Sequence, residues 1–307
     1  MSLGLRYMVV AAFFFSLMSV FVKWAGSTLP SQEIVLARAI VTLVITGVML
    51  RQRGISPLGN ARGLLALRGL LGFIALSGFY WSVTHLPLAD ATVIQYSNPV
   101  FTALLAAALL GERLRRIEAV ALLVSLSGVV LLAQPSFLFG GDARLPALGV
   151  AVAVATAILS AGAYVTVRRL KDSDDPLVVV FWFPLIAVPG TLLTMFGPMA
   201  AGLPNPGYRW PVGTEWLLLL AVGVTTQIAQ VAMTRGLHLE RAGRATMVSY
   251  LQIVFAFVWG ALFFGESVSL TAFAGAALVV SGTIAVARRR QAPQGSNASG
   301  SGSDTDA

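Results

Sequence analysis

The chain has 307 residues, of which 57% are hydrophobic and 11% are charged, whereas soluble domains average about 45–50% and about 25%. This composition excludes an ordinary water-soluble enzyme. Ten membrane helices of about 20 residues each leave only short loops and no room for an extramembrane domain. The absence of cysteine excludes disulfides, thiolate metal sites and cysteine nucleophiles. The net charge of +8 would favour a nucleic-acid partner in a soluble protein, so the placement of that charge decides its meaning.

Apolar runs separated by Gly, Pro, Arg or Asp follow one another along the whole chain. Each run is continuous and about twice as long as a strand of a membrane barrel, so each predicts a helix. The first run resembles a signal peptide, but further runs follow it and no small-residue cleavage site is evident, so we interpret it as a membrane helix. The predicted membrane helices are 5–25, 33–50, 68–85, 88–110, 117–134, 147–167, 177–197, 215–235, 244–264 and 268–287. The tail 288–307, rich in Gly, Ser, Asn and Asp, is predicted to be disordered.

The basic residues predict the orientation of the chain, because positively charged short loops stay on the cytoplasmic side. With the amino terminus inside, only Arg144 and Arg209 fall in outside loops, and both termini are cytoplasmic. The placement therefore explains the charge of the chain without a nucleic-acid partner. The residues assigned to the cytoplasmic side are Arg6, Arg51, Arg53, Arg62, Arg68, Arg113, Arg115, Arg116, Arg168, Arg169, Lys171, Arg235, Arg241, Arg244 and Arg288 to Arg290.

An internal repeat relates the two halves of the chain. A shift of 154 residues, as from Ala91 to Ala245, superposes 88–133 on 242–287. The matched pairs include Thr92 and Thr246, Tyr96 and Tyr250, Gly111-Glu112 and Gly265-Glu266, and Ser127-Gly128 and Ser281-Gly282. Five helices per half is an odd number, so the second half enters the membrane from the opposite face. We therefore predict an all-α membrane protein with ten transmembrane helices in two inverted five-helix repeats, 1–134 and 147–287, and a central substrate site between them.

These features together resemble the drug/metabolite transporter superfamily, in particular its ten-helix exporters with two EamA-type halves. The resemblance covers residues 5 to about 288 and is nearest to the bacterial aromatic amino acid exporter group. It implies export of amino acids, including aromatic ones, and related small metabolites across the bacterial inner membrane. The residues that carry it are Arg38, Ala91, Pro99, Gly111-Glu112, Gly128, Ala245, Gly265-Glu266 and Gly282. Ile253 stands where Pro99 stands in the first half, so the two halves are not expected to bend equally.

Polar and aromatic side chains at helical spacing mark the faces that turn away from lipid. Six predicted helices carry such faces, and together they are expected to enclose one cavity that binds an amphipathic molecule. The candidate substrate-binding residues are Ser16, Tyr80, Gln95, Tyr96, Pro99, Ser160, Tyr164, Gln227, Gln230 and Tyr250. The alternative is that the serines, threonines and glutamines hold helices together by hydrogen bonds across the seams.

Three residues within the apolar runs have particular alternatives. Pro99 leaves the carbonyl of Gln95 without its helical partner, which predicts either a hinge or a static kink. Lys23 either meets a substrate carboxylate at the outer mouth or extends to the outer interface. We interpret Arg38 as a structural residue that pairs with Glu33.

No acidic residue falls in the middle of a predicted helix, so the sequence offers no carboxylate for a proton relay or a sodium site of the usual kind. We expect no catalytic residues, no metal, no cofactor and no Walker loop. The expected partners are a small-molecule substrate and the lipid bilayer, and a monomer is sufficient. An anionic substrate is disfavoured because the predicted cavity holds only one marginal lysine. The alternatives are a transporter of another small metabolite or drug-like compound and, from another class, a non-transporting membrane scaffold.

Overall fold

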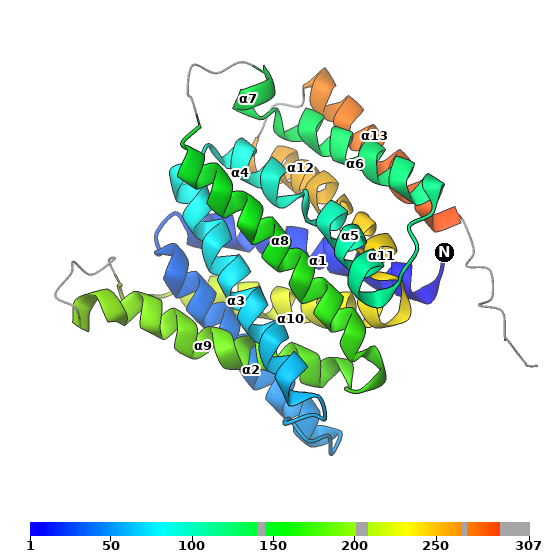
Figure 1. Cartoon of the computed structure of the whole chain (residues 1–307). Helices are drawn as coiled ribbons and strands as arrows, with labels where there is room; N and C mark the ends of the chain where they lie inside the picture. The colour runs from blue at the N-terminus through cyan, green and yellow to red at the C-terminus, as the bar shows by residue number, and fades with distance from the viewer. Residues whose placement is uncertain (140–144, 201–207, 266–268, 289–307) are drawn as a thin grey trace, which may run out of the picture.

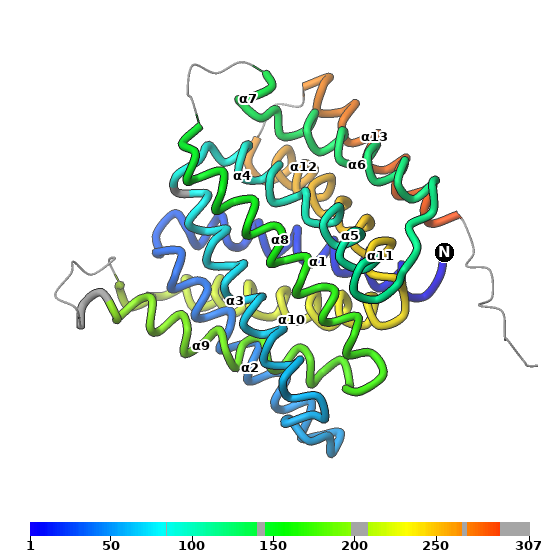
Figure 2. Tube along the Cα trace, viewed as in Figure 1, coloured from blue at the N-terminus to red at the C-terminus, as the bar shows by residue number. Residues whose placement is uncertain are grey.

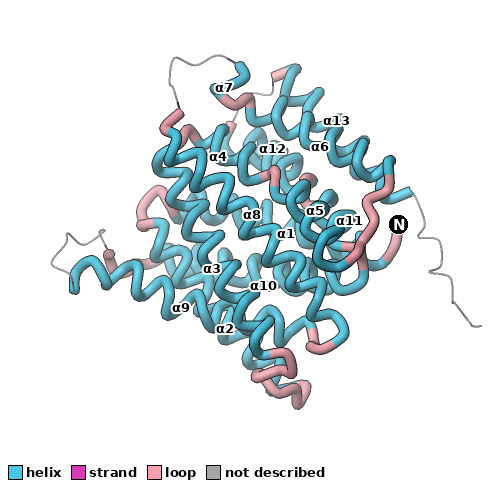
Figure 3. The backbone as a smooth tube through the Cα atoms, viewed as in Figure 1, coloured by secondary structure: helices cyan, strands magenta, loops and turns pink. Residues whose placement is uncertain are grey.

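The computed structural model describes residues 1–139, 145–200, 208–265 and 269–288. These residues form helices and loops without strands (Figure 3). Ten helical segments are long and apolar enough to cross a membrane, which confirms the predicted architecture. The helices are α1 (Leu3–Ala25), α2 (Ser31–Gln52), α3 (Arg62–His85), α4 (Leu88–Gln95), α5 (Asn98–Leu110), α6 (Arg116–Ala133), α7 (Ser136–Phe139), α8 (Ala147–Arg169), α9 (Pro176–Ala200), α10 (Glu215–Leu239), α11 (Ala242–Val248), α12 (Leu251–Phe264) and α13 (Leu270–Arg288), with a 3-10 turn at Leu170–Asp172.

The helices pack as two similar sets around one axis. Helix α1 packs on α10 as α8 packs on α3, and α1 contacts α12 as α8 contacts α5. Two helices of the first half pack on the helices that correspond to them in the second half, α2 on α9 and α6 on α13. These two pairs lie on opposite sides of the bundle (Figure 1). The arrangement is what a pseudo-twofold axis between related halves produces, and it follows the repeat found in the sequence.

Two of the membrane-spanning segments are interrupted. A turn at Tyr96 and Ser97 separates α4 from α5, and a second turn separates α11 from α12; the tube of Figure 2 follows the chain through these segments. Pro99 lies in the first turn of α5, where its missing N–H costs no helical bond. The second half breaks at Ser249 and Tyr250 without a proline. Both halves are therefore interrupted at corresponding places, although only the first half has a proline beside the interruption.

A contact between small residues joins α6 and α13, which lie side by side in Figure 1. A Cβ atom placed on Gly128 would lie 2.6 Å from the carbonyl oxygen of Gly275, and one on Gly282 would lie 2.9 Å from that of Ala121. The shift of 154 residues relates these two contacts to each other, because it carries Gly128 to Gly282 and Ala121 to Gly275. The glycines therefore allow the two backbones to approach closely, as is usual between membrane helices.

Helix α3 begins earlier than the sequence indicated. It starts at Arg62 rather than at residue 68, which places Arg68 inside the membrane-spanning segment Arg62–Val83. The placement of Arg68 at the cytoplasmic start of the helix was wrong, because the apolar residues from Gly63 to Leu67 already belong to α3. The predicted disorder of 288–307 concerns residues that, apart from Arg288, lie outside the described part of the chain, as do Arg144 and Glu266.

Candidate functional site

A cavity of about 240 Å³ lies between the helices of the two halves. From the first half, α1, α2, α3, α4 and the start of α5 line it, and from the second half α8, α9, α10, α11 and α12 do so. The α4–α5 break and the α11–α12 break both border the cavity, since Tyr96 and Ser249 belong to its wall. The lining combines aromatic rings, amides and hydroxyls, which suits a molecule with an apolar part and a polar part.

Half of the predicted binding residues lie in the wall of this cavity: Gln95, Tyr96, Ser160, Tyr164 and Gln230. The Gln95 side chain donates a hydrogen bond of 3.0 Å from Nε2 to Oγ of Ser160, so it links α4 to α8. Its Oε1 is buried and accepts no hydrogen bond. The Gln230 Oε1 accepts a hydrogen bond of 3.4 Å from Arg68. These contacts join side chains of both halves in one wall.

The other predicted residues do not line the cavity. Ser16 accepts a hydrogen bond of 3.0 Å from Trp259 Nε1 and thereby joins α1 to α12. Gln227 accepts one of 3.0 Å from Thr46 and thereby joins α10 to α2. These two residues hold helices together, which was the alternative interpretation. The remaining positions are Pro99, buried in the first turn of α5, Tyr80, half-buried beside Phe79, and Tyr250, fully buried in the core.

The structure places the two charged residues of the apolar runs, Lys23 and Arg38, in different surroundings. Lys23 is exposed near the end of α1, with its ammonium 4.0 Å from the centre of the Phe264 ring. Arg38 is 7% exposed, lines the cavity and lies 3.7 Å from the Met18 sulfur. Glu33 instead accepts a hydrogen bond of 3.5 Å from the backbone N–H of Arg209. The predicted Arg38–Glu33 pair is therefore wrong.

Arg68 is the main functional candidate that the sequence analysis missed. It is 3% exposed, lines the cavity and lies over the Phe183 ring, with 4.8 Å from its guanidinium carbon to the ring centre. The signal that could have found it is the apolar run from Gly63, which places it more than one turn inside the helix. Because the cavity wall holds two arginines rather than one marginal lysine, the argument against an anionic substrate was wrong.

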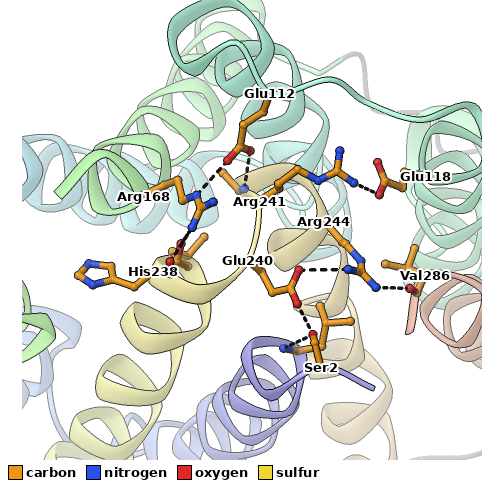
Figure 4. A network of polar contacts seen from close by, with 12 residues as sticks. Ser2, Glu112, Glu118, Arg168, His238, Glu240, Arg241, Arg244 and Val286 are labelled. Atoms are coloured by element: carbon orange, nitrogen blue, oxygen red, sulfur yellow. Dashed lines mark hydrogen bonds and ion pairs between the residues drawn. The ribbon is translucent and has the colours of Figure 1, made fainter. Parts of the chain in front are cut away.

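A network of charged residues closes the bundle at the face where α1 begins, which we call the N-terminal face (Figure 4). Glu112, after α5, pairs with Arg168 at 2.9 Å and accepts a hydrogen bond of 2.7 Å from the backbone N–H of Ala242. Arg168 also donates to the carbonyl oxygens of Leu237, at 3.2 Å, and His238, at 2.6 Å. One ion pair thus joins the ends of α5, α8 and α10 to the start of α11.

The rest of the network links the connection between α10 and α11 to the starts of α1 and α6 and to α13 (Figure 4). Arg244 pairs with Glu240 at 3.2 Å and donates a hydrogen bond of 2.9 Å to the carbonyl oxygen of Val286. Ser2 donates to Glu240, and Arg241 pairs with Glu118 at the start of α6. The Arg244–Glu240 pair is local to one segment, whereas the Glu112–Arg168 and Glu118–Arg241 pairs join the two halves, so separating the halves at this face breaks partly buried ion pairs.

The described residues include no group of His, Asp or Glu that could hold a metal ion. What the structure does supply is a bundle of ten membrane-spanning helices, two interrupted helices and a cavity shared between the halves. This combination defines a membrane transport protein of the inverted-repeat class. Comparison with known proteins agrees: the model of the EamA-like transporter family matches residues 2–134 and 147–288, and the chain belongs to that family.

Named relatives span bacteria and eukaryotes. The chain is 31% identical to the pseudopaline exporter of Pseudomonas aeruginosa over 94% of this chain and 97% of that protein. It is 30% identical to human solute carrier family 35 member G1, over 94% of this chain and 80% of that protein. A crystal structure with 23% sequence identity superposes with a TM-score of 0.77 and covers 93% of this chain and 96% of that chain, which shows the shared fold.

Two glutamines one turn apart on α10 give a direct test of which residues face the substrate. Gln230→Ala should weaken substrate binding by about tenfold, because it removes a cavity hydrogen-bonding group worth about 0.5–1.5 kcal/mol. Gln227→Ala should lower the melting temperature and leave the affinity within about twofold, because its amide contacts Thr46 and not the cavity. Half-saturation concentrations and melting curves of both variants check this. Equal affinity losses in the two variants would contradict the assignment.

Proposed function

We propose that this protein exports amino acids, aromatic ones included, and related small metabolites from the cytoplasm across the bacterial inner membrane. The observation that carries the proposal is the cavity between the halves, whose wall places the Tyr96 and Tyr164 rings near the Gln95 and Gln230 amides. Rings accommodate an apolar side chain, while amides and guanidinium groups bind the polar end of an amino acid. The name of the Pseudomonas relative as an exporter supports the direction.

The proposed mechanism is alternating access between two inverted halves. We expect the N-terminal face, which carries Arg6, Arg51 and Arg169, to be cytoplasmic because basic loops stay inside. The charged network at that face then keeps the cavity closed toward the cytoplasm in the described conformation. Cytoplasmic substrate enters when the Glu112–Arg168 pair and its neighbours separate, and the α4–α5 and α11–α12 breaks are the points at which the two halves can bend.

Counterflow in proteoliposomes tests this proposal. Vesicles preloaded with unlabelled tryptophan, phenylalanine, leucine, glutamate or lysine would receive a trace of the same labelled compound, with and without a pH gradient. We expect saturable accumulation of label for a subset of these amino acids without a gradient, since no described acidic residue lies in the cavity wall to couple protons. Protein-free vesicles serve as the control. Absence of flux for every amino acid, with protein of native melting behaviour, would contradict the proposal.

A further inference from the structure

We infer that the preferred cargo of the cavity is an amino compound with two acidic groups, as in a dicarboxylic amino acid. This inference rests on the proposed export function and specifies its substrate class. The observations that carry it are two buried arginines in one cavity wall and the absence of acidic residues from the described part of that wall.

Arg68 is a buried cation without an acidic partner among the described residues. It contacts the neutral Gln230 amide, at 3.4 Å from Nη2, and the Phe183 ring. Its Nε is buried and makes no hydrogen bond. Arginine keeps its charge in proteins and presents donors in a fork that matches a carboxylate. The guanidinium therefore has unused donor capacity toward a carboxylate in the cavity.

Arg38, on α2, is likewise a buried arginine without an acidic partner among the described residues. Its described polar contact is the weak acceptor sulfur of Met18, at 3.7 Å from Nη1. It lines the same cavity as Arg68 and is 7% exposed. A structural arginine in a membrane helix normally pairs with an acidic side chain or with backbone carbonyls, and neither contacts Arg38 in the described part of the chain. Two charges of the same sign thus border one cavity.

The described wall supplies no negative charge to balance these two arginines. Its other polar members are amides, hydroxyls and phenols, and it includes neither aspartate nor glutamate. A buried charge that lacks a partner is strongly unfavourable, so a ligand that supplies the opposite charge gains affinity. A neutral zwitterion brings one carboxylate for two guanidinium groups. A cargo with two carboxylates brings one for each.

The helix breaks bring helix ends of both signs to the cavity. Helices α5 and α12 begin at Asn98 and Leu251, inside the membrane-spanning segments, and Asn98 and Gln252 lie in the cavity wall. The N-terminus of a helix carries about half an elementary positive charge, and the C-termini of α4 and α11 at the same breaks carry about the same negative charge, so the breaks suit both the carboxylate and the ammonium group of an amino acid. Asn98 is 8% exposed and its Oδ1 lacks a hydrogen-bond partner, as does Oε1 of Gln95. These two amide oxygens are suitable acceptors for the ammonium group of an amino acid.

The test compares glutamate and aspartate with leucine and tryptophan in counterflow, each at low and at high chloride concentration. For wild-type protein, the initial rate of uptake divided by the substrate concentration should be at least tenfold higher for labelled glutamate than for labelled leucine. Arg68→Gln and Arg38→Gln should each lower glutamate transport by about 30-fold or more, the usual effect of removing one member of a buried charge pair, and leucine transport by less than threefold. Arg68→Lys keeps the charge and should retain part of the glutamate transport. Arg53→Gln, at the exposed end of α2, is the matched control and should change neither.

A binding measurement keeps the inference testable if an arginine variant turns over slowly. Purified wild-type protein and Arg53→Gln should melt at a higher temperature in the presence of glutamate than of leucine, because a ligand stabilises the state that binds it. In Arg68→Gln that difference should disappear.

The outcomes separate this inference from the proposed function. Exchange of amino acids without preference for the acidic ones would overturn the inference and leave the exporter proposal standing. If chloride alone saturated the site, and transport did not discriminate among amino acids, the arginines would bind an inorganic ion. This result would also overturn the inference. No exchange of any amino acid by natively folded protein would overturn both.

Discussion

Replacing Gly128 by valine should lower the free energy of unfolding by about 3 kcal/mol, the upper end of the usual cost of overpacking a close contact. A Cβ atom at this position would lie 2.6 Å from the Gly275 carbonyl oxygen and 2.9 Å from the Val279 backbone nitrogen. Both contacts are backbone atoms of α13, so no side chain can rotate to make room. The two helices must separate instead, and they lose the packing that holds them together in the membrane.

Thermal melting of purified protein in detergent measures this effect, with Gly63→Val as the control. Gly63 lies in the first turn of α3, where an added Cβ atom meets no atom within 4 Å. The control should melt within a few degrees of the wild type, because valine is a better helix former than glycine. If both variants melted at the same temperature, the close approach of α6 and α13 would not be what makes Gly128 necessary.

Removing Arg168 should open the N-terminal face and speed access to the cavity from that side by about 10-fold to 100-fold. Arg168 holds Glu112 and two carbonyl oxygens at the end of α10 while only 13% of its side chain is exposed. Hydrogen bonds to charged groups are worth about 1.5–3 kcal/mol each, and each 1.4 kcal/mol is a tenfold change in an equilibrium constant. Arg168→Ala leaves Glu112 partly buried without its cation, which destabilises the closed arrangement.

The absence of native cysteine makes the opening directly measurable. A single substitution, Ser160→Cys, places a thiol in the cavity wall, and a membrane-impermeant maleimide added on the N-terminal side reports access to it. The matched control is Lys171→Ala, because Lys171 forms an exposed pair with Asp172 at 3.7 Å near the same face. Such exposed pairs contribute little. Equal labelling rates in the Arg168→Ala and Lys171→Ala backgrounds would show that the Glu112–Arg168 pair does not keep this face closed.

The sequence by itself determined the architecture. Ten apolar runs of membrane-spanning length are enough to predict ten helices, because a backbone in lipid must satisfy its own hydrogen bonds. The repeated Gly111-Glu112 and Gly265-Glu266 pairs also have a local explanation, since Gly111 and Gly265 end α5 and α12 with φ of 65° and 63°, a conformation that favours glycine. Periodicity also placed Gln95, Tyr96, Ser160, Tyr164 and Gln230 on inward faces.

Only the tertiary structure decided which inward faces meet the cavity and which meet another helix. Gln227 and Gln230 share one face of α10, yet Thr46 of α2 covers the first and the second reaches Arg68. The same is true of charge. From the sequence, Arg68 was placed at the cytoplasmic start of its helix, and only the structure shows that α3 begins at Arg62. Arg38 was predicted to pair with Glu33, and only the structure shows their actual neighbours. Helical periodicity gives the direction of a side chain from its own axis, but a cavity is a property of several helices packed together. The sequence of a single segment therefore does not show which polar groups face each other across the cavity.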